Sequence, residues 1–464
     1  MAAAAEVNGG RRILFVSESS WGHINPLISI AGDLAGRGIG DIWFASTDDR
    51  KAAIEAICGG ESVRFASLGP AKPELDPANW PDETMRAMTT GSPLRNLAAL
   101  LDVNLDHTYH RQQYLRTLEV IDQLRPAVAV IDLYTRWAID AAAKRGVPYL
   151  LTCPSPVSHV YSERLPWSYP TPLSGLPRDM SASQKIRNVL FRLGVLAVIL
   201  RPKHLRANTE FARTRRAEGL ANLPARPSRY ADGAVAVLAH SVFGIEYPFP
   251  DIPGNVRMLG AIISRDTSTK VADGGGLARW LDRRESVVYA AFGTVVRLAP
   301  RQIQAITDVA ARLGPKHHVL WKLPRSQQRL LPDALPPNLR VESWVPSPLA
   351  VLAHPHVRVF FNHGGGNAIN EGLHFGKPQL VMPFWTDNPD NAARVVDCGA
   401  GLAVPHASGA EACDLAAKLT RLLGEPGFRS RAEHWSRQLR QAGGVAAAAD
   451  EITGVFDRLV RVSR

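Results

Sequence analysis

Short apolar runs alternate with stretches of helical periodicity along most of the chain, and this alternation limits its fold more than any other feature. In the first half, five runs rich in β-branched or aromatic residues are separated by segments that include amphipathic stretches. These runs are residues 13–16, 42–45, 63–66, 128–131 and 149–151. Apolar runs joined by helical crossovers predict strands of a parallel sheet that is covered on both faces.

The same alternation returns in the second half, with runs at residues 287–292, 318–323, 357–361, 379–382 and 402–404. A chain of 464 residues is too long for one hydrophobic core. We therefore predict an α/β fold of two doubly wound, Rossmann-like domains that face each other across a cleft. We place the domains at residues 1–262 and 277–445, with a polar, glycine-rich linker at 265–276. The last segment, 446–464, is expected to form a helix that crosses back to the first domain.

Composition excludes several classes of protein. The four cysteines are far apart and form no C-x-x-C pair, which argues against a zinc ribbon or a disulfide framework and fits a reducing cytoplasm. Residues 1–10 are too few and too polar for the apolar part of a signal peptide. The net charge of +11 comes from arginines spread along the chain, with no nucleic-acid recognition motif, so we expect no nucleic-acid partner.

One strongly apolar stretch, residues 188–200, interrupts the alternation and has basic residues on both sides. It is too short to span a bilayer, and it contains Arg192. We expect it to be a buried helix of the first domain or the wall of an apolar pocket. A helix lying on a membrane surface, which would make the protein peripheral to the membrane, is the less favoured alternative.

Two polar residues follow strands of the first predicted sheet. His23 comes just after the first strand, between Gly22, which permits a tight turn, and Pro26, which is suited to open a helix. Asp132 ends the fourth apolar run, and the carboxyl edge of such a sheet is where ligands bind. A histidine there can accept a proton from a hydroxyl group, and a carboxylate can orient it. Taken alone, His23 also fits a surface histidine and Asp132 a helix N-cap.

The segment from Trp344 to Asn391 carries the strongest signal. His363 and three glycines follow a predicted strand and open a helix, so backbone N–H groups and the helix dipole face an anion there. His363 can add a hydrogen bond to a diphosphate, and Glu371 can accept hydrogen bonds from ribose hydroxyls. Thr294 stands at the equivalent turn after the first strand of the second sheet. These groups converge on one sheet edge and predict a nucleotide site.

These motifs resemble those of the UDP-glycosyltransferase family, the family 1 glycosyltransferases. The resemblance rests on Trp344-Val345-Pro346, Leu352-Ala353-His354-Pro355, His363-Gly364-Gly365-Gly366-Asn367, Glu371-Gly372, Gly376-Lys377-Pro378, Pro383 and Asp387-Asn388-Pro389-Asp390-Asn391, with Gly22-His23-x-x-Pro26 and Asp132 in the first half. It implies the two-domain GT-B fold and an inverting, metal-independent transfer of a sugar.

The resemblance also implies a role for each matching residue. His23 would deprotonate the acceptor hydroxyl and Asp132 would hold the histidine. Donor-binding roles fall on Thr294, Trp344, Val345, His363, Gly365, Gly366, Asn367, Glu371, Asp387 and Asn388. Trp344 would stack on the base, and Asp387 would contact sugar hydroxyls. UDP-glucose is the default donor; Asn388 and Ser347 stand where the family usually has glutamine, so another sugar or a dTDP donor stays open.

The acceptor is expected to be small and lipophilic, such as a polyketide, macrolide or aromatic natural product. The loops of the first half carry many aromatic residues, including the run at 165–170, which suits a flat or macrocyclic apolar ligand. No single residue is assigned to acceptor binding, and the sequence does not define the oligomeric state.

Other functions are weighed against transfer. A lipase-like hydrolase would need a G-x-S-x-G elbow, which the chain lacks, and an oxidoreductase would need G-x-G-x-x-G after the first strand. Two alternatives stay open: a non-catalytic GT-B partner that activates another transferase, and a nucleotide-sugar 2-epimerase. The presence of His23, Asp132, His363 and Glu371 together favours transfer.

Overall fold

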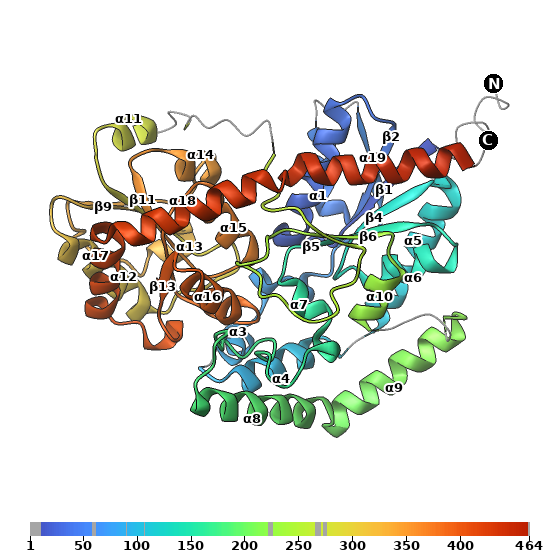
Figure 1. Cartoon of the computed structure of the whole chain (residues 1–464), viewed down its shortest axis with the longest axis horizontal. Helices are drawn as coiled ribbons and strands as arrows, with labels where there is room; N and C mark the ends of the chain where they lie inside the picture. Colours follow the sequence, from blue (N-terminus) through green and yellow to red (C-terminus); the bar gives the residue numbers. More distant parts are fainter. Residues whose placement is uncertain are drawn as a thin grey trace.

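The computed structural model describes residues 11–57, 62–89, 91–105, 107–220, 226–264, 271 and 276–462. Most of the linker expected at 265–276, the tail at 1–10 and Cys58 lie outside these residues. The described chain forms two parallel β-sheets, each with helices on its faces (Figure 1).

The first sheet has seven strands in the order β3-β2-β1-β4-β5-β6-β7, all parallel. The strands are β1 (Arg12–Val16), β2 (Asp41–Ser46), β3 (Val63–Ser67), β4 (Val128–Asp132), β5 (Tyr149–Cys153), β6 (Ala236–Ala239) and β7 (Val256–Met258). Because the order reverses direction between β1 and β4, the loops after these two strands diverge and leave room for a ligand at the carboxyl edge.

The second sheet has six parallel strands in the order β10-β9-β8-β11-β12-β13. They are β8 (Val287–Ala291), β9 (His318–Lys322), β10 (Leu339–Glu342), β11 (Val357–Asn362), β12 (Gln379–Val381) and β13 (Gly401–Ala403). Its order reverses between β8 and β11, so it has the same kind of switch point as the first sheet.

Every apolar run singled out in the sequence is a strand, which confirms the predicted α/β fold with two parallel sheets. Strands β6, β7 and β10 complete the sheets and were not predicted. β7 has three residues and most of β10 is only partly buried, so neither stands out as a long apolar run, whereas β6 lies within an apolar run at 234–239 that is as clear as the predicted ones.

Helices cover both sheets. Those before the linker are α1 (Trp21–Gly36), α2 (Lys51–Glu55), α3 (Asp82–Met88), α4 (Pro93–Val103), α5 (Thr108–Leu124), α6 (Arg136–Lys144), α7 (Val157–Val160), α8 (Ala182–Ile199), α9 (Pro202–Ala217) and α10 (Pro227–Gly233). Those after it are α11 (Leu277–Asp282), α12 (Pro300–Leu313), α13 (Arg325–Gln328), α14 (Pro348–Ala353), α15 (Gly366–His374), α16 (Asn388–Asp397), α17 (Ala412–Gly424), α18 (Pro426–Gln441) and α19 (Gly444–Val462).

The last helix, α19, leaves the second domain and lies along α1 of the first (Figure 1). Val445, Ala448 and Ile452 are buried in the same apolar cluster as Ile13 of β1 and Ile24 of α1. The chain end therefore completes the core of the domain in which the chain begins.

Helix α1 begins at Trp21, so the expectation that Pro26 opens it is wrong: Pro26 lies inside the helix. A proline inside a helix has no N–H to donate to the carbonyl four residues earlier, which here is that of Gly22. The Gly22 carbonyl instead accepts a hydrogen bond from Nδ2 of Asn367 at 2.7 Å. Because Pro26 cannot donate to it, the Gly22 carbonyl is available to accept a hydrogen bond from the second domain.

The expectation that residues 188–200 form a buried helix or a pocket wall is also wrong. These residues form most of α8, in which only Asn188 and Val198 are buried. Within the described part of the chain, no helix is long and apolar enough to cross a membrane.

Helix α16 of the second domain carries a buried carboxylate whose partners lie in the first domain. Asp390 accepts hydrogen bonds from the backbone N–H groups of Leu173 and Gly175, and its Oδ2 lies 2.8 Å from Nε2 of His159. A buried carboxylate is stable only when its lone pairs are used. This residue therefore ties α16 to the first domain.

One turn later, Arg394 crosses the same interface. It donates hydrogen bonds to Oε1 of Glu246 at 3.0 Å and to Oγ of Ser158 at 3.1 Å, and its guanidinium lies 4.4 Å from the ring centre of Tyr247. Arg394 and Glu246 are 5% and 2% exposed. Each charge depends on the other domain for its partner.

We predict that Glu246→Gln lowers the free energy of unfolding by about 3 kcal/mol, because it removes the carboxylate hydrogen-bonded to the buried Arg394 at nearly unchanged volume and leaves Asp390 as the remaining counter-charge. Urea unfolding followed by circular dichroism measures the loss. Glu451→Gln, which removes a partly exposed ion pair with Arg257, is the matched control and should cost less than about 1 kcal/mol. Equal losses in the two variants would contradict the role of the buried pair.

Candidate active site

An acid–base pair lies at the carboxyl edge of the first sheet. Nδ1 of His23, in the first turn of α1, is 3.1 Å from Oδ1 of Asp132 at the end of β4. Oδ2 of Asp132 accepts hydrogen bonds from the backbone N–H of Tyr134 and from Oγ1 of Thr135. The N-cap of α6 is Thr135, so Asp132 is not a helix cap. Its fully buried carboxylate is instead positioned toward the histidine.

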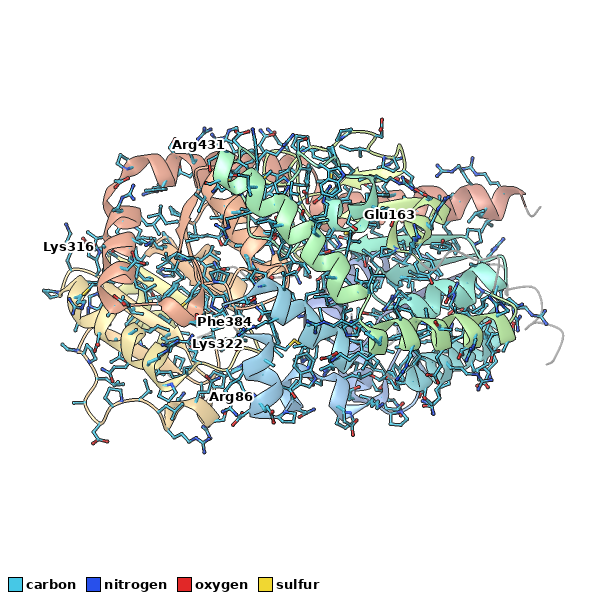
Figure 2. The ribbon with its side chains drawn as sticks, turned by 90° about the horizontal axis from the view of Figure 1, so that it is seen from below. Arg86, Glu163, Lys316, Lys322, Phe384 and Arg431 are labelled. Carbon is cyan, nitrogen blue, oxygen red and sulfur yellow. The ribbon has the colours of Figure 1, made fainter. Side chains whose placement is uncertain are left out.

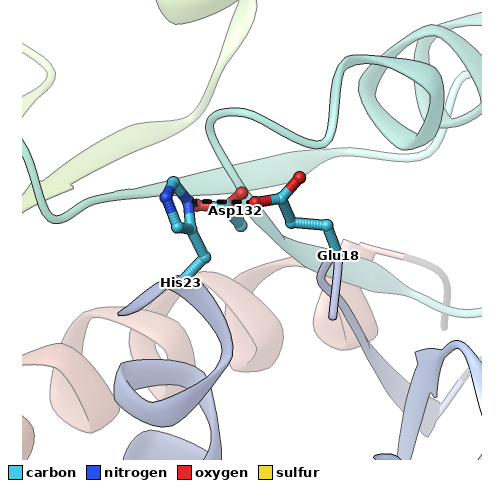
Figure 3. A group of neighbouring side chains, drawn as sticks. All are labelled: Glu18, His23 and Asp132. Atoms are coloured by element: carbon cyan, nitrogen blue, oxygen red, sulfur yellow. Dashed lines mark hydrogen bonds and ion pairs between the residues drawn. The ribbon is translucent and has the colours of Figure 1, made fainter. Parts of the chain in front are cut away.

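Glu18, in the loop between β1 and α1, brings a second carboxylate to the same imidazole. Its Oε1 lies 3.8 Å from Nδ1 of His23, and Figure 3 shows the three side chains converging. Burial opposes a charge on His23, but the negative charges of Asp132 and Glu18 outweigh it and raise the pKa of His23 to about 9. Burial also raises the pKa of Glu18, and the charge of His23 opposes that change.

Glu18, His23 and Asp132 are also the one group of described residues whose donor atoms lie close enough to hold a metal ion, within 4.8 Å of one another. A cation there would compete with the proton on Nδ1 for the same lone pair. Asp132 already uses both oxygens in hydrogen bonds, one to His23 and the other to Tyr134 and Thr135. The hydrogen bonds of this group are therefore those expected of a site that holds a proton on Nδ1 of His23.

The anion-binding turn lies at the carboxyl edge of the second sheet. His363 follows β11, and its ring is held between two glycines: a Cβ atom at Gly293 would lie 3.0 Å from the ring, and one at Gly365 would lie 2.6 Å from it. Burial lowers the pKa of His363 to about 4, so the ring is neutral at physiological pH. Its Nδ1 is buried and has no hydrogen-bond partner among the described residues. A ligand with phosphate oxygens would supply one.

The same turn approaches the first domain directly. Gly366, the first residue of α15, is so close that a Cβ atom there would lie 2.4 Å from the carbonyl oxygen of Pro154. Asn367 donates its amide to the Gly22 carbonyl, next to His23. Any side chain at position 366 would push the two sheet edges apart. Glycine is thus required by domain contact as well as by phosphate binding.

A second group of residues that are expected to bind the nucleotide sugar lies near the ends of β9 and β10. Trp344 is 66% exposed, and Nζ of Lys322 lies 5.2 Å from its ring centre. Burial raises the pKa of Glu371 to about 7, and the charge of Lys322 opposes that rise. Val345 is 0% exposed and packs in the apolar core of the second domain. An open aromatic face beside a carboxylate suits a base and a ribose.

The loop before α16 contains the expected sugar-contacting acid. Asp387 is held by the amide of Asn391, which donates to its Oδ2 at 3.0 Å and also to the Gly364 carbonyl at 2.8 Å. Asn391 therefore links the loop that contains Asp387, which we call the sugar loop, to the glycine-rich turn at residues 363–366, which we call the phosphate turn. Asn388 is 3% exposed, and its Oδ1 accepts from the backbone N–H of Trp385 at 3.4 Å, so its side chain is used inside the loop.

Across the domain interface, Asn367 and Asp387 of the second domain lie close to Gly22 and His23 of the first, whereas Asn388 is turned into its own loop and Thr294 is exposed at the turn after β8. The charge of Asp387 contributes to the raised pKa of His23, which shows how near the two domains approach.

Tyr134 and Trp167 are two exposed aromatic side chains of the first domain. Tyr134 is 43% exposed, with its ring 4.7 Å from that of His23. Of the aromatic run at 165–170, Tyr169 is buried and Trp167 is 56% exposed.

Three residues near these sites were not singled out in the sequence: Glu18, Lys322 and His240. His240 follows β6, is 3% exposed, and has no hydrogen-bond partner on either ring nitrogen among the described residues. Burial and the charge of His23 lower its pKa to about 3. Position at the carboxyl end of a strand is a signal that could have identified Lys322 and His240.

A cavity of about 520 Å³ also lies between the domains. Its wall is mostly apolar and comes from α4, the loop at 173–177 and α16, and it borders Trp385 and Thr386, just before Asp387. His23 does not line it. The cavity is therefore next to the sugar loop but separate from the acid–base pair.

Two doubly wound domains, with an acid–base pair on one facing edge and a glycine-rich anion turn on the other, define a glycosyltransferase of the GT-B class. The chain belongs to the family described as UDP-glucoronosyl and UDP-glucosyl transferase, which matches residues 149–439.

Individual relatives agree with this assignment. The chain is 26% identical over 456 residues to 4'-demethylrebeccamycin synthase of Lentzea aerocolonigenes, covering 96% of this chain and 100% of that one. It is 38% identical over 114 residues to erythritol-mannosyl-transferase 1 of Pseudozyma antarctica, but this match spans 24% of the chain and 18% of that relative. Among solved structures, the glycotransferase of kitacinnamycin is similar in fold, with a TM-score of 0.71 and 21% identity over 96% of this chain and 98% of that one.

We predict that Glu18→Gln moves the acid limb of the pH profile of kcat/KM to lower pH by about one unit or more. In the wild type the limb should lie near the His23 pKa of about 9, because His23 must lose its proton to act as a base. Removing a neighbouring negative charge lowers that pKa, so the base becomes available at lower pH. Glu55→Gln, on α2, should leave the profile unchanged. An unaltered limb in Glu18→Gln would contradict the assigned coupling.

Proposed function

We propose that this chain is an inverting glycosyltransferase that transfers a hexose from a UDP-sugar, with UDP-glucose as the default donor, to a hydroxyl group of a small lipophilic acceptor. The observation that carries the proposal is the contact between Asn367 and the Gly22 carbonyl. This contact brings the phosphate turn at residues 363–366 close to His23, which supports a proposal in which the base and the leaving diphosphate lie on opposite sides of one small space.

In this proposal the acid–base pair activates the acceptor. The hydrogen bond to Asp132 engages Nδ1 of His23, which leaves Nε2 as the atom that takes the proton of the hydroxyl group. Asp132 holds the ring and stabilises the imidazolium that forms. The oxygen then attacks the anomeric carbon from the face opposite the diphosphate, so an α-linked donor gives a β-linked product.

The second domain stabilises the departing diphosphate. His363 is neutral because of its burial, so it acts as a hydrogen-bond donor and not as a cation. Thr294 and the backbone N–H groups at Gly365, Gly366 and the start of α15 supply further donors, and the helix dipole adds to their effect. Trp344 would stack on the base and Glu371 would hold the ribose, whereas Val345 would support Trp344 from the core.

Sugar selection falls on the loop before α16. Asp387 would accept hydrogen bonds from the sugar hydroxyls, and Asn391 fixes its orientation. Asn388 lies inside this loop, so we assign it to shaping the loop and not to direct contact. In this proposal the position of Asp387 determines which hexose is accepted.

Two observations support a lipophilic acceptor of the natural-product type. The exposed ring of Tyr134 lies beside His23 and offers an apolar surface where the acceptor hydroxyl must be placed. A full-length relative is named for the synthesis of demethylrebeccamycin. This likeness supports the proposal of a natural-product acceptor, for which a polyketide, macrolide or aromatic compound is our candidate.

We predict that His23→Ala lowers kcat by about a hundredfold to ten-thousandfold, because it removes the general base, and leaves UDP affinity nearly unchanged. UDP release measures the rate, and calorimetry measures the affinity. His317→Ala is the control, since His317 lies at the amino end of β9, on the edge away from the nucleotide. Wild-type turnover in His23→Ala would exclude the proposed mechanism, and the absence of any product in the wild type would favour a non-catalytic GT-B partner.

We predict that UDP-glucose raises the melting temperature in the presence of EDTA as much as in its absence, and more than dTDP- or GDP-sugars do. At matched concentrations, a ligand that binds only the folded state raises the melting temperature more the more tightly it binds, with a logarithmic dependence on its Kd. The reason for the EDTA result is that hydrogen-bond donors at the His363 turn, and not a cation, hold the phosphates. Loss of the UDP-glucose shift in EDTA would instead assign a metal to the site.

A further inference from the structure

The outer face of α8 is apolar along its whole length, although it faces solvent. Seven large side chains recur at spacings of one or three residues, the last just after the helix, and are 39% to 63% exposed: Ile186, Val189, Leu190, Leu193, Leu196, Ile199 and Leu200. Leu205, on α9, continues the face and is 43% exposed. We call these eight residues the α8 face. Exposed apolar surfaces of this extent mark interaction sites.

The opposite side of α8 is polar and fixes the helix to the protein. Asn188 is 1% exposed; its Nδ2 donates to the carbonyls of Trp167 and Tyr169, and its Oδ1 accepts from the backbone N–H of Thr171. Arg192 donates to Oγ1 of Thr171, and its guanidinium lies 4.9 Å from the ring centre of Trp167. Asn188 and Arg192 thus face inward together with Val198, while most of the large apolar side chains face outward, which is unusual for a surface helix.

Helix α9 continues from α8 along the same side of the molecule. His204, at its start, is hydrogen-bonded to Asp102 of α4 through Nε2 at 2.9 Å. In Figure 1 the two helices lie along one outer side, away from both sheets, and Figure 2, seen from that side, shows them crossing the front of the molecule. A flat partner could therefore reach the α8 face without meeting either domain core.

Basic residues border the α8 face. Lys185, Arg187, Arg201 and Arg206 are exposed, and Glu210 is the single carboxylate in α8 and α9. A second copy of this chain would bring a like-charged border to the same interface, whereas an anionic lipid surface is complementary to it. An apolar face with a basic border and a nearby exposed tryptophan, Trp167, is typical of a helix that lies in a membrane interface.

We propose that the α8 face docks the enzyme on a membrane surface that contains anionic phospholipid. The apolar side chains enter the headgroup and acyl boundary, and the basic border contacts lipid phosphates. Helix α8 is about 27 Å long at 18 residues, and it lies flat on the bilayer. The proposal is independent of the sugar and of the acceptor.

Co-sedimentation with vesicles tests this proposal. We expect the full chain to bind vesicles of phosphatidylcholine and phosphatidylglycerol in equal parts, to bind pure phosphatidylcholine vesicles more weakly, and to dissociate as salt is added. Leu190→Ser with Leu193→Ser should weaken binding at least about tenfold. Lys185→Gln should weaken it by about fivefold, and only on the anionic vesicles.

The matched control is Leu330→Ser with Leu335→Ser, since these two leucines of the second domain are 38% and 40% exposed. This control should bind vesicles like the wild type. The melting temperature and the UDP-induced shift should be the same in all variants, because none of these side chains belongs to the nucleotide site. A negative vesicle-binding result would therefore count against membrane docking and not against the proposed transfer reaction.

Two results would overturn the proposal. The first is a failure of the vesicle test. In that case the wild type and the variant with both Leu190→Ser and Leu193→Ser bind vesicles equally, or neither of them binds. The other is a dimer in sedimentation equilibrium without lipid that this variant converts to a monomer, which would assign the α8 face to a second copy of the chain.

Discussion

The buried charges of α16 are the constraint on which the active site depends. Asp390 and Arg394 belong to the second domain, but their hydrogen-bond partners belong to the first. Separating the domains would leave both charges without these partners. The same helix begins just after Asp387, so the interaction that holds the domains together also sets the sugar loop opposite His23.

The two catalytic edges use burial in opposite ways. On the first sheet, the carboxylates beside His23 outweigh the effect of burial, and its pKa rises. On the second sheet no carboxylate among the described residues raises the pKa of His363, so burial dominates and its pKa falls. One histidine is thereby suited to exchange a proton, and the other to remain a neutral donor beside a diphosphate. The difference lies in neighbours contributed by separate segments of the chain.

Much of this arrangement was predictable. The apolar runs predicted the strands of both sheets except β6, β7 and β10. The pairing of His23 with Asp132 followed from their positions after two strands of one parallel sheet. Glu18 could not be predicted, because it lies in a loop whose path depends on the Thr135 hydroxyl. Pro26 was misassigned as a helix start, because local preference at a helix N-terminus gave no information about the Gly22 carbonyl that Asn367 uses.

The sequence by itself determined the two parallel sheets, the switch-point edges and the residue types that carry the chemistry, because hydrophobic periodicity and glycine turns act over short distances. Only the tertiary structure decided which face of α8 meets solvent, since an apolar stripe is the same in sequence whether it packs inward or outward. It also decided how closely Gly366 approaches Pro154 and where the charges of α16 find their partners. Those outcomes depend on contacts between residues far apart in the chain.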